Sequence, residues 1–95
     1  MAQAMENIRQ DPGIRLVDVR SPGEYREGHL PGSLSIPLDD LGQVRRLIPE
    51  TGATIYAYCA SGARSAMAVG LLKRMGYSQV QNIGGIMSYP GELER

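Results

Sequence analysis

The chain has 95 residues with ten basic and ten acidic side chains, so its formal net charge is zero. This length predicts one domain over residues 1–95 with a core of modest size. The charge balance gives no electrostatic sign of a nucleic-acid partner or of binding to an anionic membrane surface. One cysteine and one histidine exclude an internal disulfide framework and a cysteine-rich metal site, and the sequence predicts no metal and no cofactor.

No apolar stretch is long enough to span a bilayer, and the N-terminal segment lacks the apolar core of a signal peptide. We therefore expect no membrane partner and a cytoplasmic location. The basic pairs Arg45-Arg46 and Lys73-Arg74 are interpreted as solvated helix faces and ends, which is the usual role of such pairs.

In chain order, residues 2–10 are predicted as a short amphipathic helix. Residues 14–19 form a nearly continuous apolar run, which is typical of an interior strand covered on both faces. Ser21, Pro22 and Glu24 then predict the start of a short helix, because a serine N-cap, a proline at the first helical position and a glutamate three residues after the cap form a capping box.

Residues 33–37 are predicted as a short extended segment, and Asp39-Asp40 as the cap of a helix that ends near Ile48. The run 53–58 is rich in β-favouring residues and predicts a strand, while the apolar spacing of residues 65–75 predicts a helix.

Gly76 is expected to close that helix in a left-handed conformation. Residues 80–83 are predicted as the last strand, Gly84-Gly85 as a turn, and residues 86–95 as a tail with some helix. This alternation of strands and helices predicts an α/β fold with a mainly parallel sheet and right-handed crossovers. In such sheets ligands bind beyond the carboxyl ends of the strands, and Cys59 lies at such an end.

Cys59 is the only cysteine, and it stands between a predicted strand and a predicted helix. Converging loop amides, a helix N-terminus and an arginine each favour the thiolate, so we expect a lowered pKa for this thiol. Gly62 permits a tight backbone turn, and the small Ala60, Ser61 and Ala63 are expected to leave the mouth of the loop open to a ligand. The alternative is a buried packing cysteine, which is the common role of a lone cysteine in a small domain.

The backbone amides that follow Cys59 can stabilise an anionic sulfur without acidic or basic side chains. Arg64 is the only charged residue of the loop and is assigned to attracting an anionic donor, the alternative being an arginine that turns to solvent or pairs with an acid elsewhere. The two loop serines are assigned to binding. The predicted substrate-binding residues are Ala60, Ser61, Gly62, Ala63, Arg64 and Ser65.

Three segments, LVDVRSPGEYREGHLPGSLSIP (16–37), YCASGARSA (58–66) and NIGGIMSYPGE (82–92), resemble in order and spacing the signature segments of the rhodanese-like sulfurtransferase family. The resemblance implies a small rhodanese-like domain with a mainly parallel sheet of four to five strands and helices on both faces. It also implies that Cys59 attacks a donor such as thiosulfate or a persulfide, carries the sulfur as a persulfide, and delivers it to a thiol or cyanide. A protein sulfur donor or acceptor is a further expected partner.

Four residues of the first segment are interpreted as structural support. Asp18 and Arg20 are expected to form a buried or partly buried ion pair, and Glu24 is interpreted in the same way. His29 marks a shaped turn and is assigned a structural role, because an activated thiolate needs no general base.

The chain departs from the family pattern at both ends. It starts at a helix where the family usually has a short strand first, so we expect four strands or an exposed sheet edge. Tyr89 stands where many relatives have a tryptophan, which affects the expected rim of the pocket.

Two other functions fit parts of the pattern. Cysteine-dependent phosphatases and arsenate reductases space their cysteine and arginine as C-x5-R, whereas Cys59 and Arg64 are spaced as C-x4-R, which narrows the loop and favours a single sulfur over a phosphoryl group. A non-catalytic binding or regulatory module is the other alternative, since one fold hosts many functions. Such modules commonly lose the cysteine, which this chain keeps.

Overall fold

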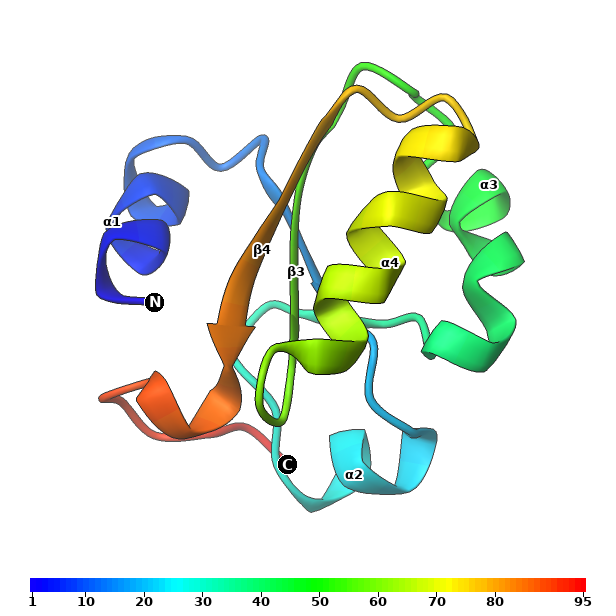
Figure 1. Ribbon diagram of the computed structural model, residues 1–95. Coiled ribbons are helices and arrows are strands. Elements are labelled where there is room, and N and C mark those ends of the chain that lie inside the picture. The colour runs from blue at the N-terminus through cyan, green and yellow to red at the C-terminus, as the bar shows by residue number, and fades with distance from the viewer.

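The computed structural model describes residues 1–95, and Figure 1 shows how the helices surround a central sheet. The elements in chain order are α1 (Ala2–Gln10), β1 (Arg15–Asp18), α2 (Pro22–Glu27), β2 (Leu34–Ser35), the 3-10 helix η1 (Leu38–Gln43), α3 (Val44–Leu47), β3 (Thr54–Cys59), α4 (Ala63–Arg74), β4 (Gln79–Gly85) and the 3-10 helix η2 (Ile86–Ser88).

The sheet has four strands in the order β2-β1-β3-β4, and all neighbouring strands are parallel. The most buried strand is β3, in which five of six residues are buried, because it has a strand on each side and helices on each face. Its apolar and aromatic composition suits this position. The predicted α/β fold with a mainly parallel sheet of four to five strands is therefore confirmed.

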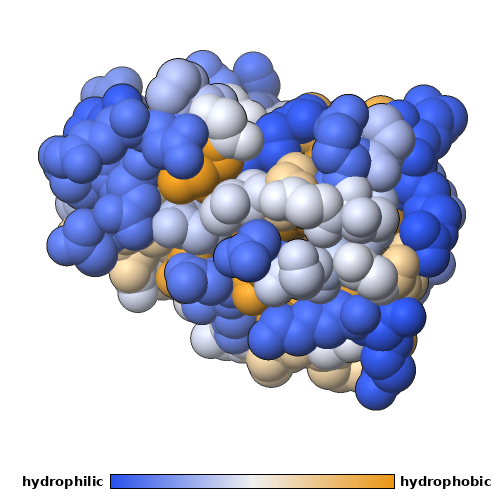
Figure 2. Space-filling view, turned by 90° about the horizontal axis from the view of Figure 1, so that it is seen from above, coloured by the Kyte–Doolittle hydropathy of each residue, from blue (hydrophilic) through white to orange (hydrophobic).

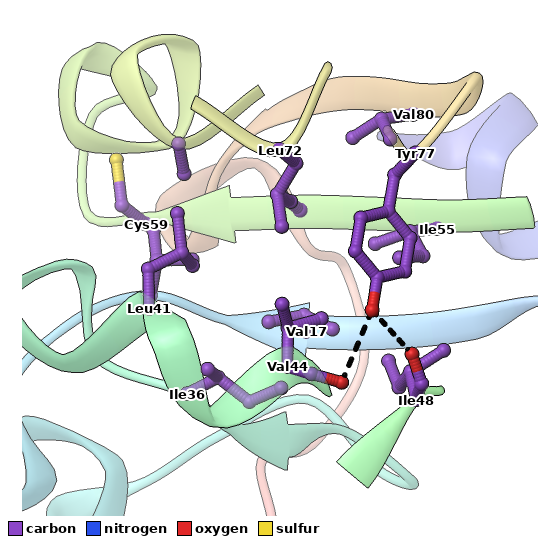
Figure 3. Close-up of a cluster of buried hydrophobic side chains, with 13 residues drawn as sticks. Val17, Ile36, Leu41, Val44, Ile48, Ile55, Cys59, Leu72, Tyr77 and Val80 are labelled. Atoms are coloured by element: carbon purple, nitrogen blue, oxygen red, sulfur yellow. Dashed lines mark hydrogen bonds between the residues drawn. The ribbon is translucent and has the colours of Figure 1, made fainter. Parts of the chain in front are cut away.

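Helices cover both faces of the sheet, with α1 on one side and α3 and α4 on the other (Figure 1). The larger hydrophobic cluster lies under α3 and α4 and includes residues of every strand except the short β2, whose Leu34 packs against its border. Figure 3 shows Tyr77 within this cluster, where its hydroxyl lies 2.6 Å from the Ile48 carbonyl oxygen and 3.3 Å from that of Val44. The smaller cluster lies under α1 and contains Leu16, Leu30, Tyr56 and Tyr58.

The start of α2 agrees with the predicted capping box. The Glu24 amide donates to the Ser21 hydroxyl oxygen at 3.2 Å, and the Ser21 amide donates to a carboxylate oxygen of Glu24 at 3.1 Å. Each bond satisfies an amide that the helix itself leaves unpaired. The residues of this turn are therefore held in fixed positions next to the carboxyl end of β1.

Two predicted boundaries were wrong. Asp39 and Asp40 do not cap a helix: helical structure already begins at Leu38 as a 3-10 turn after Pro37, and Asp40 has non-helical backbone angles. The predicted turn at Gly84-Gly85 is the end of β4, where the register with β3 shifts between Ala57 and Cys59.

The molecule's outer surface is mostly polar at the end seen in Figure 2, which looks down on the top of Figure 1, away from the tip of the β4 arrow. Residues of intermediate hydropathy fill the middle of this view, and hydrophobic residues show only in small areas between them. The longest helix has 12 residues, and no helix combines the length and the apolar character that crossing a membrane requires.

Candidate active site

The site lies at the carboxyl end of β3, where the chain passes through a short loop into α4. Cys59 is the last residue of the strand, and the helix begins at Ala63, two residues earlier than the apolar spacing indicates. Gly62 precedes the helix with φ of 100°, a left-handed conformation that glycine adopts without steric cost. This turn directs the backbone amides of the loop back toward the cysteine.

Three hydrogen-bond donors converge on the sulfur of Cys59. The Gly62 amide lies 3.0 Å from Sγ, and both the amide and the hydroxyl of Ser65 lie 3.4 Å from it. Burial by itself raises the pKa of the Cys59 thiol, but the hydrogen bonds from Ser65, Gly62 and Ser61 outweigh burial and lower that pKa. The site is therefore arranged to hold an anionic sulfur.

The cysteine itself is not open to solvent. Its exposed fraction is 0%, and it belongs to the larger hydrophobic cluster together with Leu41. Figure 3 shows the sulfur at the edge of this cluster, pointing toward the beginning of α4. The sulfur has no exposed surface because the loop folds its amides over it, so the small residues at the mouth of the loop do not expose the thiol itself. The exposed loop residues are Ser61 and Ala63, while Ala60 and Gly62 are half-buried.

Arg64 adopts the arrangement that the sequence left as its alternative, a pair with an acid elsewhere. Its Nη1 and Nη2 atoms lie 2.7 and 3.0 Å from the two carboxylate oxygens of Glu24 on α2. About a third of each side chain is exposed, 38% for Arg64 and 32% for Glu24. The hydrogen bonds from Arg64 lower the pKa of Glu24 to about 2, and those from Glu24 raise the pKa of Arg64.

A cleft of about 420 Å³ opens beside the first turn of α4, where Arg64 lines it, whereas Cys59 and residues 60–63 do not. The other lining residues come from the carboxyl ends of β1 and β2 and from the segments that follow them: Val19, Ser21, Pro22, Ser35, Pro37, Leu38, Asp39, Asp40 and Gln43. Its position agrees with the expectation that ligands bind beyond the carboxyl ends of parallel strands.

The expected ion pair of Asp18 and Arg20 is present and buried, with a distance of 2.8 Å between Oδ2 and Nη2. The Arg20 guanidinium also donates to the Gly28 carbonyl oxygen at 2.6 Å, so the pair ties β1 to the turn that contains His29. His29 stacks on Tyr25 and bonds to its carbonyl oxygen through Nδ1, at 2.8 Å. These contacts hold the backbone around the site, and none of them is to Cys59.

Asn82 on β4 also belongs to the site, and the sequence interpretation missed it. Its Oδ1 accepts from the Ser65 hydroxyl at 2.7 Å and from the Gly84 amide at 2.9 Å, and its Nδ2 donates to the Gly62 carbonyl oxygen at 3.0 Å. Asn82 therefore connects β4 to both residues that donate to the sulfur. The feature of the sequence that could have indicated this role is a polar side chain two residues before a glycine pair.

No group of three or more histidine, cysteine, aspartate or glutamate side chains comes together in a way that could hold a metal ion. The site combines a buried sulfur, the donors around it and the neighbouring cleft. A thiolate surrounded by fixed amides can act as a nucleophile and can stabilise negative charge on an atom bound to it.

Comparison with known proteins places this fold and loop in one family. The model of the rhodanese-like domain matches residues 1–90, so the chain belongs to the rhodanese-like family. The protein named thiosulfate sulfurtransferase PspE from Escherichia coli (strain K12) is 35% identical over 71 residues, covering 74% of this chain and 68% of that protein. A protein named sulfurtransferase from Allochromatium vinosum is 36% identical over 85 residues, covering 88% of this chain and 78% of that protein.

Solved structures with a similar fold support the same family assignment. A structure described as rhodanese with anions from E. coli matches with a TM-score of 0.80 and 30% identity, covering 86% of this chain and 98% of that one. The human single-domain sulfurtransferase TSTD1 matches with a TM-score of 0.75 and 26% identity, covering 87% and 85% of the two chains. The chain spans 64% and 48% of the lengths of two further relatives, both from Bacillus subtilis.

Proposed function

We propose that the protein is a sulfurtransferase that moves sulfane sulfur from thiosulfate or a persulfide donor to a thiol or cyanide acceptor through a persulfide on Cys59. The observation that carries this proposal is the convergence of the Gly62 amide and the Ser65 amide and hydroxyl on the Cys59 sulfur, at 3.0 to 3.4 Å. These donors favour the thiolate, which is the reactive form of cysteine.

In the first step the Cys59 thiolate attacks the outer sulfur of the donor. A bond forms between the two sulfurs, the bond from that sulfur to the rest of the donor breaks, and sulfite leaves if the donor is thiosulfate or a thiolate leaves if it is a persulfide. In the second step an acceptor thiolate attacks the outer sulfur of the enzyme persulfide, and the Cys59 thiolate is regenerated. Fixed amides can stabilise the negative charge on sulfur in both steps.

The proposal needs a path for the donor, because Cys59 has no exposed surface. The cleft of about 420 Å³ beside Arg64 is the place we propose for the donor, and because neither Cys59 nor residues 60–63 line it, the loop has to move before the donor reaches the sulfur. Local opening is common in segments with few buried apolar contacts, and the side chains of Ala60, Ser61 and Ala63 are small and not buried.

The pair of Arg64 and Glu24 supports sulfur transfer over phosphatase or arsenate reductase chemistry. A phosphatase needs the guanidinium of its loop arginine free to donate to two phosphoryl oxygens at once. In this structure Nη1 and Nη2 of Arg64 both donate to the carboxylate of Glu24 instead. The retained cysteine with its donors supports an enzyme over a purely binding module. A protein sulfur donor or acceptor is also compatible with this site.

The test is the intact mass of the protein after incubation with thiosulfate or with glutathione persulfide, followed by a thiol acceptor. We expect a gain of one sulfur atom that is absent in Cys59→Ser and disappears when the acceptor is added. No gain with either donor would contradict the proposal. Hydrolysis of p-nitrophenyl phosphate, measured in parallel, would then favour the phosphatase alternative.

A further inference from the structure

Glu24 neutralises the cation of the loop. Both of its carboxylate oxygens accept from the Arg64 guanidinium, and one of them also accepts from the Ser21 amide at 3.1 Å. The carboxylate is thus held from two sides, by the first turn of α2 and by the arginine. Because a paired guanidinium attracts an anion less than a free one, the loop presents no uncompensated positive charge to an incoming donor.

The cleft next to this pair carries further negative charge. Asp39 and Asp40 line it, and Arg64 is its only basic lining residue. Val19, Pro22 and Leu38 add apolar surface to the same walls. A volume of about 420 Å³ lies within the range of pockets that bind organic molecules, which is about 300–1,000 Å³. Its charge disfavours an inorganic dianion and favours a molecule with a protonated amine.

We infer that Glu24 is a positioning residue that sets donor preference: by holding Arg64 it directs the site toward organic persulfides with a protonated amine and away from dianionic thiosulfate. This inference rests on the proposed function and names the donor class for that same site. In the favoured reaction the Cys59 thiolate attacks the outer sulfur of the persulfide, a new sulfur–sulfur bond forms, and the aminothiol leaves as its thiolate.

The first experiment uses the unaltered protein. The rate at which Cys59 gains sulfur is measured by intact mass over a range of salt concentrations, with thiosulfate and with cysteamine persulfide as the two donors. We expect added salt to speed the reaction of thiosulfate, because salt screens repulsion from the acidic cleft, and to leave that of cysteamine persulfide within about twofold, because its protonated amine balances its anionic persulfide sulfur. A thiosulfate rate that falls with salt would indicate attraction by an available Arg64 and would overturn the inference.

The second experiment replaces Glu24 by Gln, which keeps a side-chain oxygen for the Ser21 amide and therefore keeps the capping box. At low salt we expect the thiosulfate rate constant to rise by about 1.5- to 5-fold through a lower half-saturating concentration, the range for one partly exposed charge interaction. The cysteamine persulfide rate should stay within about twofold, and the gain should disappear near 1 M salt, where the Debye length is about 3 Å.

The matched control is Glu27→Gln, which removes the same charge from an exposed position of the same helix. It should leave the ratio of the two donor rates unchanged. The double variant Glu24→Gln/Arg64→Gln should not show the increased thiosulfate rate of Glu24→Gln, because the guanidinium that Glu24→Gln releases is absent from it. An unchanged donor ratio in Glu24→Gln, or an equal loss with both donors, would overturn this inference alone. Failure of both donors to add sulfur to the unaltered protein would overturn the proposed function and this inference together.

Discussion

Gly85 is a position where one added carbon atom should disturb the active loop without straining the backbone. Its φ and ψ angles, −108° and 149°, are those of ordinary extended chain, which any residue adopts. A Cβ atom there would lie 2.3 Å from the Ala60 carbonyl oxygen and 3.0 Å from the Ser61 Cα atom. Glycine is needed at this position because the loop after Cys59 passes directly over it.

The size of the effect follows from that overlap. Real Cβ contacts are essentially never shorter than 3.0 Å, so Gly85→Ala requires a movement of at least 0.7 Å (3.0 − 2.3) between β4 and the loop. A misplacement of about 1 Å at a reacting group can cost about 100-fold in rate. We therefore expect Cys59 to gain sulfur about 10- to 100-fold more slowly in Gly85→Ala, with about 1–3 kcal/mol of lost stability from overpacking.

The matched control is Gly84→Ala, one residue earlier. Gly84 has φ of 100°, and a Cβ atom there would meet nothing within 4 Å. This variant should lose about 1–2 kcal/mol through its left-handed backbone and leave the loop in place. The rate of sulfur gain, measured by intact mass under conditions where both variants are folded, separates the two effects. Equal rates in the two variants would refute the reasoning about the loop.

Three further predictions concern single side chains. Ser65→Ala removes a donor to the sulfur, so the pKa of Cys59 should rise and the pH profile of its alkylation should move to higher pH; an unmoved profile would contradict the assignment. Because the pKa of Glu24 is lowered from 4.5 to about 2, the stability that its ion pair contributes is complete above about pH 4.5 and is lost as the pH falls through about 2. An NMR titration that gives this carboxyl a pKa near 4.5 would contradict the prediction. Tyr58→Phe leaves the buried amide of Leu30 without its partner at 3.0 Å and should cost about 1–3 kcal/mol in urea unfolding, so a loss below about 0.5 kcal/mol would argue against that bond.

The elements of the fold are predictable because their signals are local. The apolar run at 14–19 and the β-favouring run at 53–58 became neighbouring buried strands, β1 and β3. The capping box at Ser21 is encoded in four adjacent residues and formed as predicted. The strand-to-helix passage at Cys59 likewise needs only the composition on each side of it.

The contacts that define the site were harder to predict, because they join distant parts of the chain. Glu24 and Arg64 are 40 positions apart, and either residue alone is compatible with solvent exposure or with pairing. Asn82 reaches the loop from β4, where it pairs with Ala57 of β3, and the one local signal for it was a polar side chain two residues before a glycine pair. The burial of Cys59 depends on how tightly the loop closes over the sulfur, which the small size of the loop residues does not determine.

The burial of Cys59 among hydrophobic side chains makes sulfur transfer a packing event as well as a chemical one. A persulfide adds an atom as large as the thiol sulfur at a position with no exposed surface, so the loop over it has to give way or the added atom has to occupy space at its edge. The empty and sulfur-loaded proteins should therefore unfold at different temperatures. A thermal melt would then serve as a gauge of how much of a protein sample carries sulfur.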